Sequence, residues 1–130
     1  MKFSARFLQF SQKIARWAIV PAIAIVVWGE LAPTPPTAAL IWDKLLHFIA
    51  YFGLSGLSLL ALSPGRRAAV AAGVLILMGG VLEIAQGLVG RDASWGDEAA
   101  NALGAVIGCA LGWVIVRLLE RSARGTTERG

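Results

Sequence analysis

The chain has 130 residues, of which 57% are hydrophobic and 15% are charged, and its mean hydropathy is +0.69. This composition is too apolar for an ordinary soluble domain. A bilayer core about 30 Å thick takes about 20 helical residues, so the chain has room for one domain with at most about four to five spans. The net charge of +4 does not indicate a nucleic-acid-binding protein, because the basic residues flank apolar runs and form no patch with interleaved aromatics. We therefore predict an integral membrane protein that contacts anionic lipid headgroups.

The first fifteen or so residues predict an amphipathic helix. Apolar residues from Phe3 to Trp17 recur at helical spacing, beside a second stripe of basic and polar residues from Lys2 to Arg16. A helix of this kind lies at the membrane interface, so we expect an interfacial helix that leads into the first span. The alternative is a secretory signal peptide, because a basic start and an apolar run precede small residues at 37–39.

Four apolar stretches follow, at residues 14–31, 45–62, 68–89 and 99–119. Each is about long enough to cross a bilayer, and helices are expected because lipid offers no partner for unpaired backbone groups. A Pro-rich loop at 32–36, a Ser-Pro-Gly-Arg-Arg turn at 63–67 and a polar segment at 90–98 separate them. The tail at 121–130, rich in Arg, Gly and Thr, is expected to be disordered. The predicted fold is all-α: one domain over residues 1–130, a polytopic membrane four-helix bundle with an N-terminal interfacial helix.

The charged residues predict the orientation of the spans. Ten of the twelve Lys and Arg lie before or at the start of the first apolar run, between the second and third, or toward the end of the chain. Six of the eight acids lie in the complementary segments, at Glu30, Asp43, Glu83, Asp92, Asp97 and Glu98. By the positive-inside rule, the basic stretches and both termini are cytoplasmic. We expect a multi-pass protein of the cytoplasmic (inner) membrane whose functional residues open outward.

The second span begins with polar residues spaced by four. Asp43, His47 and Tyr51 therefore share one face of a helix. Asp43 also suits a helix start, where its carboxylate accepts backbone N–H groups, so a plain capping role stays open. His47 lies about 6 Å deeper. Since ionisable groups inside membrane helices are costly and tend to mark functional sites, we favour a functional role for it.

In the third span, Glu83 and Gln86 lie three residues apart on one face. Arg91 is expected near the outer boundary, which places Glu83 about 12 Å deeper. A carboxylate at that depth needs a partner or a proton. The sequence offers these partners: His47, Tyr51, Arg91 and Asn101. The alternative is a buried hydrogen-bonded pair that only fixes helix packing.

The fourth span carries its polar and small residues along one face, at Asp97, Asn101, Gly104, Gly108 and Gly112. Small residues at every fourth position allow helices to approach closely, so we interpret the three glycines as a packing surface. The same face then carries Asp97 and Asn101 toward the polar residues of the second and third spans. Three helices are thus expected to share one polar volume in the outer half of the membrane.

The sequence predicts no metal and no cofactor. Cys109 is the only cysteine, which excludes a disulfide within the chain and a Cys-based metal site. No compact ligand motif such as H-E-x-x-H occurs, so the single His and several carboxylates are not expected to form a metal site.

Two segments, DKLLHFIAYF at 43–52 and EIAQGLVGRDASWGDEAANALGAVIG at 83–108, together resemble the VanZ-like family of small bacterial membrane proteins. The resemblance extends from the first span to the fourth. Its motif residues fall on Asp43, Lys44, His47, Tyr51, Glu83, Gln86, Arg91, Ser94, Asp97, Asn101 and Gly104. One departure is that residues 87–90 lack the Pro that many relatives carry before the Arg.

The family is named for a glycopeptide-resistance accessory protein associated with teicoplanin, so the resemblance implies a cell-envelope role. We expect an outward-facing polar pocket that binds a lipid-linked or peptidoglycan-related ligand, with a contribution to glycopeptide resistance. In this hypothesis Lys44 and Arg91 contact an anionic group of the ligand. The other ligand-binding candidates are Asp43, Tyr51, Gln86, Ser94, Asp97 and Asn101.

Catalysis is left open as an alternative. In an intramembrane hydrolase or transferase acting on a lipid-linked substrate, His47 would be the general base and Glu83 or Asp43 would orient it or act as the acid. Arg91 would stabilise developing negative charge. A scaffold within a larger membrane complex and proton-coupled transport are further alternatives, and the sequence does not determine the oligomeric state.

Overall fold

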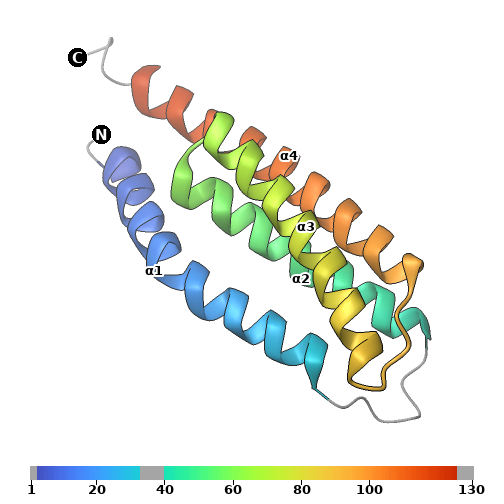
Figure 1. The fold of residues 1–130 in the computed structure, drawn as a ribbon. Coiled ribbons are helices and arrows are strands. Elements are labelled where there is room, and N and C mark those ends of the chain that lie inside the picture. Colours follow the sequence, from blue (N-terminus) through green and yellow to red (C-terminus); the bar gives the residue numbers. More distant parts are fainter. Residues whose placement is uncertain (1–2, 33–39, 126–130) are drawn as a thin grey trace.

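The computed structural model describes residues 3–32 and 40–125, and nearly all of them are helical (Figure 1). The helices are α1 (Phe3–Leu31), α2 (Leu40–Leu62), α3 (Arg66–Leu88) and α4 (Trp95–Gly125). All four are long and apolar enough to cross a membrane. The described residues contain no strand, and the predicted all-α membrane four-helix bundle is confirmed.

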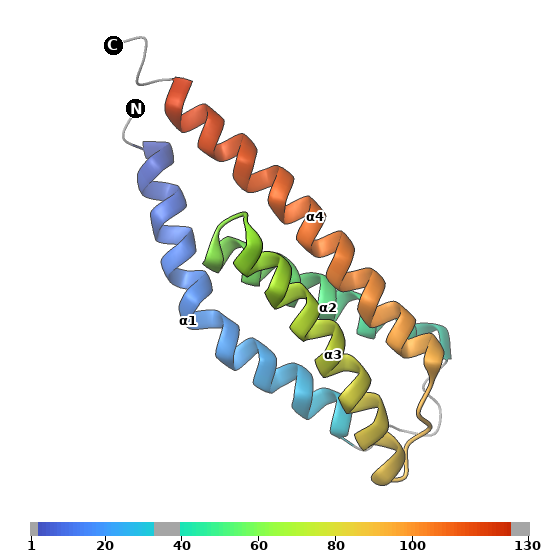
Figure 2. The same cartoon turned by 45° about the horizontal axis from the view of Figure 1, so that its top comes forward.

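Consecutive helices run in opposite directions, so α2 and α4 run the same way. The start of α1 and the end of α4 lie at one end of the bundle in both ribbon views (Figures 1 and 2). The end of α1, the start of α2, the end of α3 and the start of α4 therefore meet at the opposite end. This is the end where the sequence analysis expected the polar residues to gather.

The most extensive contact in the bundle is between α2 and α4. It depends on two glycines whose backbone touches the backbone of α2. A Cβ atom built on Gly104 would lie 2.3 Å from the carbonyl oxygen of Phe48, and one on Gly108 would lie 2.3 Å from that of Phe52. At Gly112 the nearest atom, Leu59 Cδ2, would be at an ordinary 3.4 Å. All three glycines face α2, but only the first two require the absence of a side chain.

The first helix is continuous, with no break between the expected interfacial segment and the first span. Pro21 lies inside it. Because proline has no N–H and its ring crowds the preceding turn, it explains the bend near the middle of α1 in Figure 1. Two hydrogen bonds hold the first half of α1, which the sequence analysis expects on the cytoplasmic side, against the end of α2 and the α2–α3 turn. Gln12 Nε2 donates to Ser63 Oγ at 2.9 Å, and Arg16 Nε donates to the carbonyl of Ala61 at 3.0 Å.

Several helix boundaries differ from the prediction, most of all in α2 and α4. The predicted disorder from residue 121 is wrong for residues 121–125, because α4 continues to Gly125. Arg and Ala are good helix formers, so nothing ends the helix before that glycine. The second and fourth helices begin earlier than expected, at Leu40 and Trp95. The small residues at 37–39 and the tail at 126–130 lie outside the described residues, as does the Pro-rich loop apart from residue 32.

The distribution of polar and apolar side chains suits a lipid environment. Large apolar side chains cover the outside, with Trp17, Trp28 and Leu77 each more than 70% exposed. His47 and Glu83 are buried, with exposed fractions of only 5% and 6%. Because hydrocarbon cannot solvate a carboxylate or an imidazole, such groups are stable only when they face each other inside a bundle. The candidate functional residues are therefore the polar side chains buried inside the bundle.

We predict that Gly108→Ala destabilises the bundle by about 1–3 kcal/mol, because its Cβ would collide with the α2 backbone and push the helices apart. The matched control is Gly53→Ala, where a Cβ would meet nothing within 4 Å and where helix propensity improves by up to about 1 kcal/mol. Thermal unfolding in detergent, followed by tryptophan fluorescence, would compare the two variants. Equal stability of Gly108→Ala and the parent protein would contradict the backbone contact.

Candidate functional site

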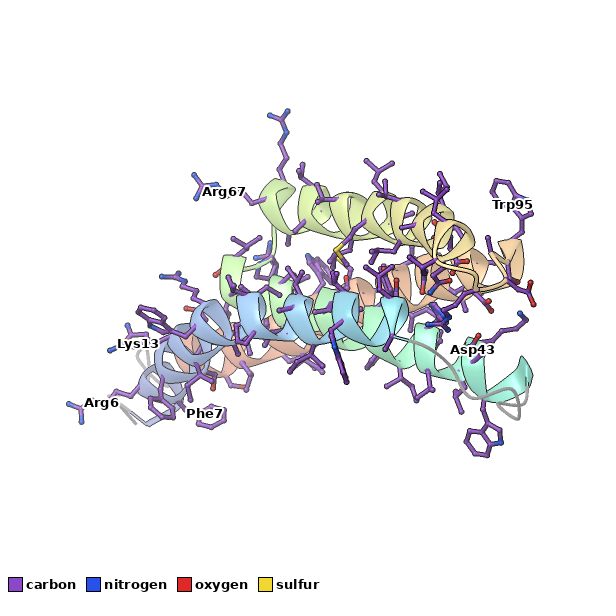
Figure 3. All side chains as sticks on the ribbon, turned by 60° about the horizontal axis from the view of Figure 1, so that its bottom comes forward. Arg6, Phe7, Lys13, Asp43, Arg67 and Trp95 are labelled. Atoms are coloured by element: carbon purple, nitrogen blue, oxygen red, sulfur yellow. The ribbon has the colours of Figure 1, made fainter. Side chains whose placement is uncertain are left out.

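All four helices send polar side chains to the end of the bundle where α3 joins α4. Figure 3 shows Asp43 and Trp95 at this end, with Arg6, Lys13 and Arg67 at the other. The buried polar residues gathered here are Glu30, His47, Glu83, Gln86, Asp97 and Asn101, with Tyr51 a turn deeper in α2. The structure thus brings together the polar face predicted for the second, third and fourth spans and adds one residue from the first.

The centre of the site is His47, which α2 holds against α4. Its Nδ1 lies 3.0 Å from Oδ1 of Asn101, and both side chains are buried. Asn101 Nδ2 donates to Oε2 of Glu98 at 3.4 Å, which orients the amide so that its oxygen faces the ring. This hydrogen-bond network assigns the proton of the neutral imidazole to Nδ1. The other nitrogen, Nε2, is then left with a lone pair, and it lies 3.9 Å from Oδ1 of Asp43.

Two further carboxylates approach the same imidazole from α1 and α3. Oε1 of Glu30 lies 3.6 Å from His47 Nδ1, and Oε1 of Glu83 lies 3.9 Å from it. Both oxygens of Glu30 and Oε1 of Glu83 are buried without a hydrogen-bond partner among the described residues. The second oxygen of Glu83 accepts the backbone N–H of Ser94 at 3.0 Å. His47 is therefore surrounded by carboxylates from three different helices.

Glu30 is the site residue that the sequence analysis did not select. It was grouped only with the acids of the outward segments, although it is the sole acid in the first apolar run and lies at the end of that run. Those two features were the available signal. What they could not show is that α1 packs against α2 and α3, which turns Glu30 inward to 7% exposure beside His47.

Arg91 and Gln86 hold the end of α1 in place. Arg91 Nη1 donates to the carbonyls of Gly29 at 3.4 Å, Ala32 at 3.2 Å and Glu30. Gln86 Nε2 donates to the same Glu30 carbonyl at 3.0 Å. The last carbonyls of a helix have no partner within the helix and attract cations, so both side chains cap α1 from the end of α3. Arg91 also lies 3.8 Å from Asp43. Both were predicted ligand contacts, and the structure gives both a structural task.

Lys44 and Ser94 connect the starts of α2 and α4. Lys44 Nζ lies 2.8 Å from Asp97 Oδ1 and donates to Ser94 Oγ at 3.4 Å. Ser94 Oγ accepts the backbone N–H of Gly96 at 3.2 Å, in the first turn of α4. Asp97 is almost fully buried, whereas the Lys44 side chain is 44% exposed. Lys44 is therefore the site cation that is most free to move.

Tyr51 lies below this layer and is fully buried. Its hydroxyl neighbours the Glu30 carboxylate but makes no hydrogen bond of standard geometry. It forms part of the floor of the site, and its ring belongs to the apolar core with Leu54, Leu75 and Ala105.

Two cavities border the cluster. One of about 290 Å³ lies between α1 and α2, where Glu30, Asp43, His47 and Arg91 share its wall with apolar side chains such as Leu46. The other, of about 480 Å³, lies between α3 and α4 and is mostly apolar. Its polar wall is formed by Glu83, Ser94 and Glu98. Since Glu83 lines the second cavity and lies close to His47 in the wall of the first, the two cavities flank one polar centre.

Charge in the site is unbalanced. The carboxylates of Asp97 and Asp43 are near Lys44 and Arg91, respectively. The remaining acids are Glu30, Glu83 and Glu98, and their neighbouring polar groups among the described residues are His47, Asn101, the Ser94 N–H and the Tyr51 hydroxyl. The site therefore offers more acceptors than donors and suits a ligand that carries donors or positive charge.

A scan against models of known protein families, a search of curated proteins and a search of solved structures each returned no match. The structure defines a class, that of multi-pass helical membrane proteins with a buried histidine–carboxylate site. The resemblance to the VanZ-like family stays a prediction.

We predict that Arg91→Ala destabilises the protein by about 2 kcal/mol or more, because it removes charged hydrogen bonds to the last carbonyls of α1. Hydrogen–deuterium exchange should show lost protection around Gly29 and Glu30. Arg67→Ala, at the exposed start of α3, is the control and should change neither the stability nor the exchange. Unchanged exchange at the end of α1 in Arg91→Ala would refute the capping role.

Proposed function

We propose that this protein is a multi-pass protein of the bacterial cell envelope whose polar pocket faces outward and binds the headgroup of a lipid-linked envelope ligand. The observation that carries the proposal is the centre itself: a buried histidine approached by three carboxylates, next to a cavity of about 290 Å³. Unsatisfied buried carboxylates are costly in a membrane protein and tend to be kept for function.

The outward orientation rests on the distribution of charge. The exposed basic residues Arg66 and Arg67 lie at the start of α3, at the end of the bundle opposite the site. Lys13 and Arg16 of α1 and Arg117 and Arg121 of α4 belong to the same half. Basic residues next to membrane spans stay in the cytoplasm, so the site end is the outer one.

The chemistry of the site selects among ligands. Its acceptors favour a headgroup with hydroxyl, amide or ammonium donors, such as a sugar or peptide attached to a lipid. Arg91 is already engaged with α1 and is 12% exposed, so Lys44 at the rim is the better candidate to contact a phosphate. The mostly apolar cavity between α3 and α4 ends at Glu83 and Ser94 and fits a hydrocarbon chain. Polar and apolar parts of an amphiphile thus each find a matching surface.

The specific role in glycopeptide resistance rests on the resemblance to the VanZ-like family alone. That resemblance and the site geometry select overlapping residues, since His47, Glu83, Asp97 and Asn101 belong to both. A peptidoglycan-related ligand satisfies both lines of argument, because its sugar and peptide groups carry the donors that the site lacks.

A second candidate, an intramembrane hydrolase or transferase, is favoured by one observation. His47 is held at Nδ1 by Asn101, which leaves Nε2 free to take a proton. Glu30 and Glu83 are close enough to stabilise the imidazolium that would result. In such a reaction His47 would be the general base toward water or a substrate hydroxyl, and no serine or cysteine nucleophile would be required.

We predict that Glu30→Gln and Glu83→Gln each weaken binding of the undecaprenyl-linked peptidoglycan precursor lipid II by about tenfold, or about 1.4 kcal/mol, since each replaces one acceptor oxygen by an N–H₂ donor. Binding would be measured by microscale thermophoresis in nanodiscs. Undecaprenyl phosphate, which lacks the sugars and peptide, serves as the comparison ligand, and Glu120→Gln, in the other half of α4, as the control variant.

Three outcomes separate the hypotheses. Saturable binding without turnover supports the accessory role, whereas product formation that is lost in His47→Gln supports the enzyme. Equal binding by the parent and both Glu variants would exclude the pocket as the ligand site.

We also predict that a cysteine at position 95, introduced as Trp95→Cys in a Cys109→Ala background, reacts with a membrane-impermeant maleimide in intact cells. Trp95 is 92% exposed at the start of α4, so the new thiol is accessible. Arg67→Cys in the same background should react only after the membrane is permeabilised. The reverse pattern would place the site in the cytoplasm and refute the proposed orientation.

A further inference from the structure

We propose that Asp43, His47 and Asp97 form a binding site for a divalent transition-metal cation of the Zn²⁺ type. One ligand atom from each of these residues lies within 4.8 Å of the others. Nε2 of His47 is 3.9 Å from Oδ1 of Asp43. Zinc binds such atoms at about 2.0–2.2 Å in tetrahedral geometry, so two ligand atoms of one ion lie about 3.3–3.6 Å apart. The three side chains would have to close by about 1 Å, a shift within the reach of side-chain rotation, to coordinate one ion.

The surroundings of His47 are those of a metal-binding histidine. Such residues almost always donate the N–H of one ring nitrogen to a neighbouring oxygen, which fixes the ring and leaves the other nitrogen for the metal. Here Nδ1 is bonded to Asn101 Oδ1 at 3.0 Å, and Nε2 is the nitrogen that faces Asp43. Asn101 thus prepares His47 as a ligand.

An independent observation is that two carboxylates beside His47 have unpaired oxygens. Glu30 and Glu83 are more than nine-tenths buried, and an oxygen of each faces Nδ1 of His47, at 3.6 and 3.9 Å. Three of their four carboxylate oxygens have no hydrogen-bond partner among the described residues. A cation bound at Nε2 would make the Nδ1–H a stronger donor toward these unpaired carboxylate oxygens.

Asp97 already attracts one cation, the ammonium group of Lys44. Its ammonium lies 2.8 Å from Oδ1 of Asp97, one of the three ligand residues. Because the Lys44 side chain is 44% exposed, it can turn into water and release Asp97 to a metal. Lys44 and the metal would therefore compete for Asp97, and removing the lysine should strengthen metal binding.

The ligand set favours zinc over magnesium. One imidazole and two carboxylates suit zinc with an open fourth position, whereas magnesium prefers oxygen ligands and water. The absence of a compact motif is explained by the fold, since the ligands come from one turn of α2 and from α4. This inference does not depend on the lipid ligand proposed above.

The test uses the full chain without a polyhistidine tag, purified in detergent, stripped with EDTA and re-equilibrated with Zn²⁺. His47 and Cys109 are the only histidine and cysteine in the chain, so background binding is low. We expect close to one equivalent of zinc per chain by mass spectrometry of the desalted protein, and weak retention of Mg²⁺. Asp43→Asn, His47→Gln and Asp97→Asn should each weaken Zn²⁺ binding by about tenfold or more, whereas Lys44→Gln should strengthen it.

Glu120→Gln and Cys109→Ala are the matched controls and should bind zinc like the parent chain. If a ligand variant fails to fold, as judged by circular dichroism, the Lys44→Gln result and the visible spectrum of the Co²⁺-loaded parent protein decide the question. No zinc on the folded parent chain, or ligand variants that bind zinc as tightly as the parent chain, would overturn the proposal. Zinc binding without lipid II binding would leave this site standing and remove the proposed function, and the opposite result would do the reverse.

Discussion

The backbones of α2 and α4 touch at Gly104 and Gly108, and the geometry of the site depends on this contact. A Cβ at either position would lie 2.3 Å from a carbonyl oxygen of α2, so a larger residue would separate the helices. At their present spacing, Asn101 reaches His47 and Asp97 reaches Lys44 across the same interface. Van der Waals contact drives helix association in lipid, where no hydrophobic effect does so. One face of α4 therefore provides both the close helix packing and the polar contacts of the site.

Lipid explains why the polar residues gather where they do. A bilayer offers no hydrogen bonds to carboxylates or to helix ends, so each must find a partner within the protein. Arg91 and Gln86 satisfy the end of α1, and Lys44 satisfies Asp97. After these pairings, Glu30 and Glu83 still have buried oxygens without partners around His47. That remaining imbalance gives the site its affinity for donors and cations, and it is the physical basis of both proposals made for the pocket.

Predicting the site from sequence succeeded for residues on the faces of single helices and failed for those defined by packing between helices. The four-residue spacing of Asp43 and His47, and of Asp97 and Asn101, is fixed by helix geometry, and the structure places these residues together. Arg91 was expected to contact ligand because an arginine in a membrane protein is a natural anion contact. Its actual partners are backbone carbonyls of α1, which no sequence pattern marks. Glu30 was left out for the same reason.

The sequence by itself determined the number of helices, the polar faces of α2, α3 and α4 and the glycine surface, because hydropathy and helical periodicity are local properties of the chain. Only the tertiary structure decided that α1 contributes Glu30, that Arg91 and Gln86 cap a helix end, and that Asp43, His47 and Asp97 converge. These features depend on distances between helices that are far apart in the chain. Such distances follow from how the four helices pack as a set, and no single segment carries that information.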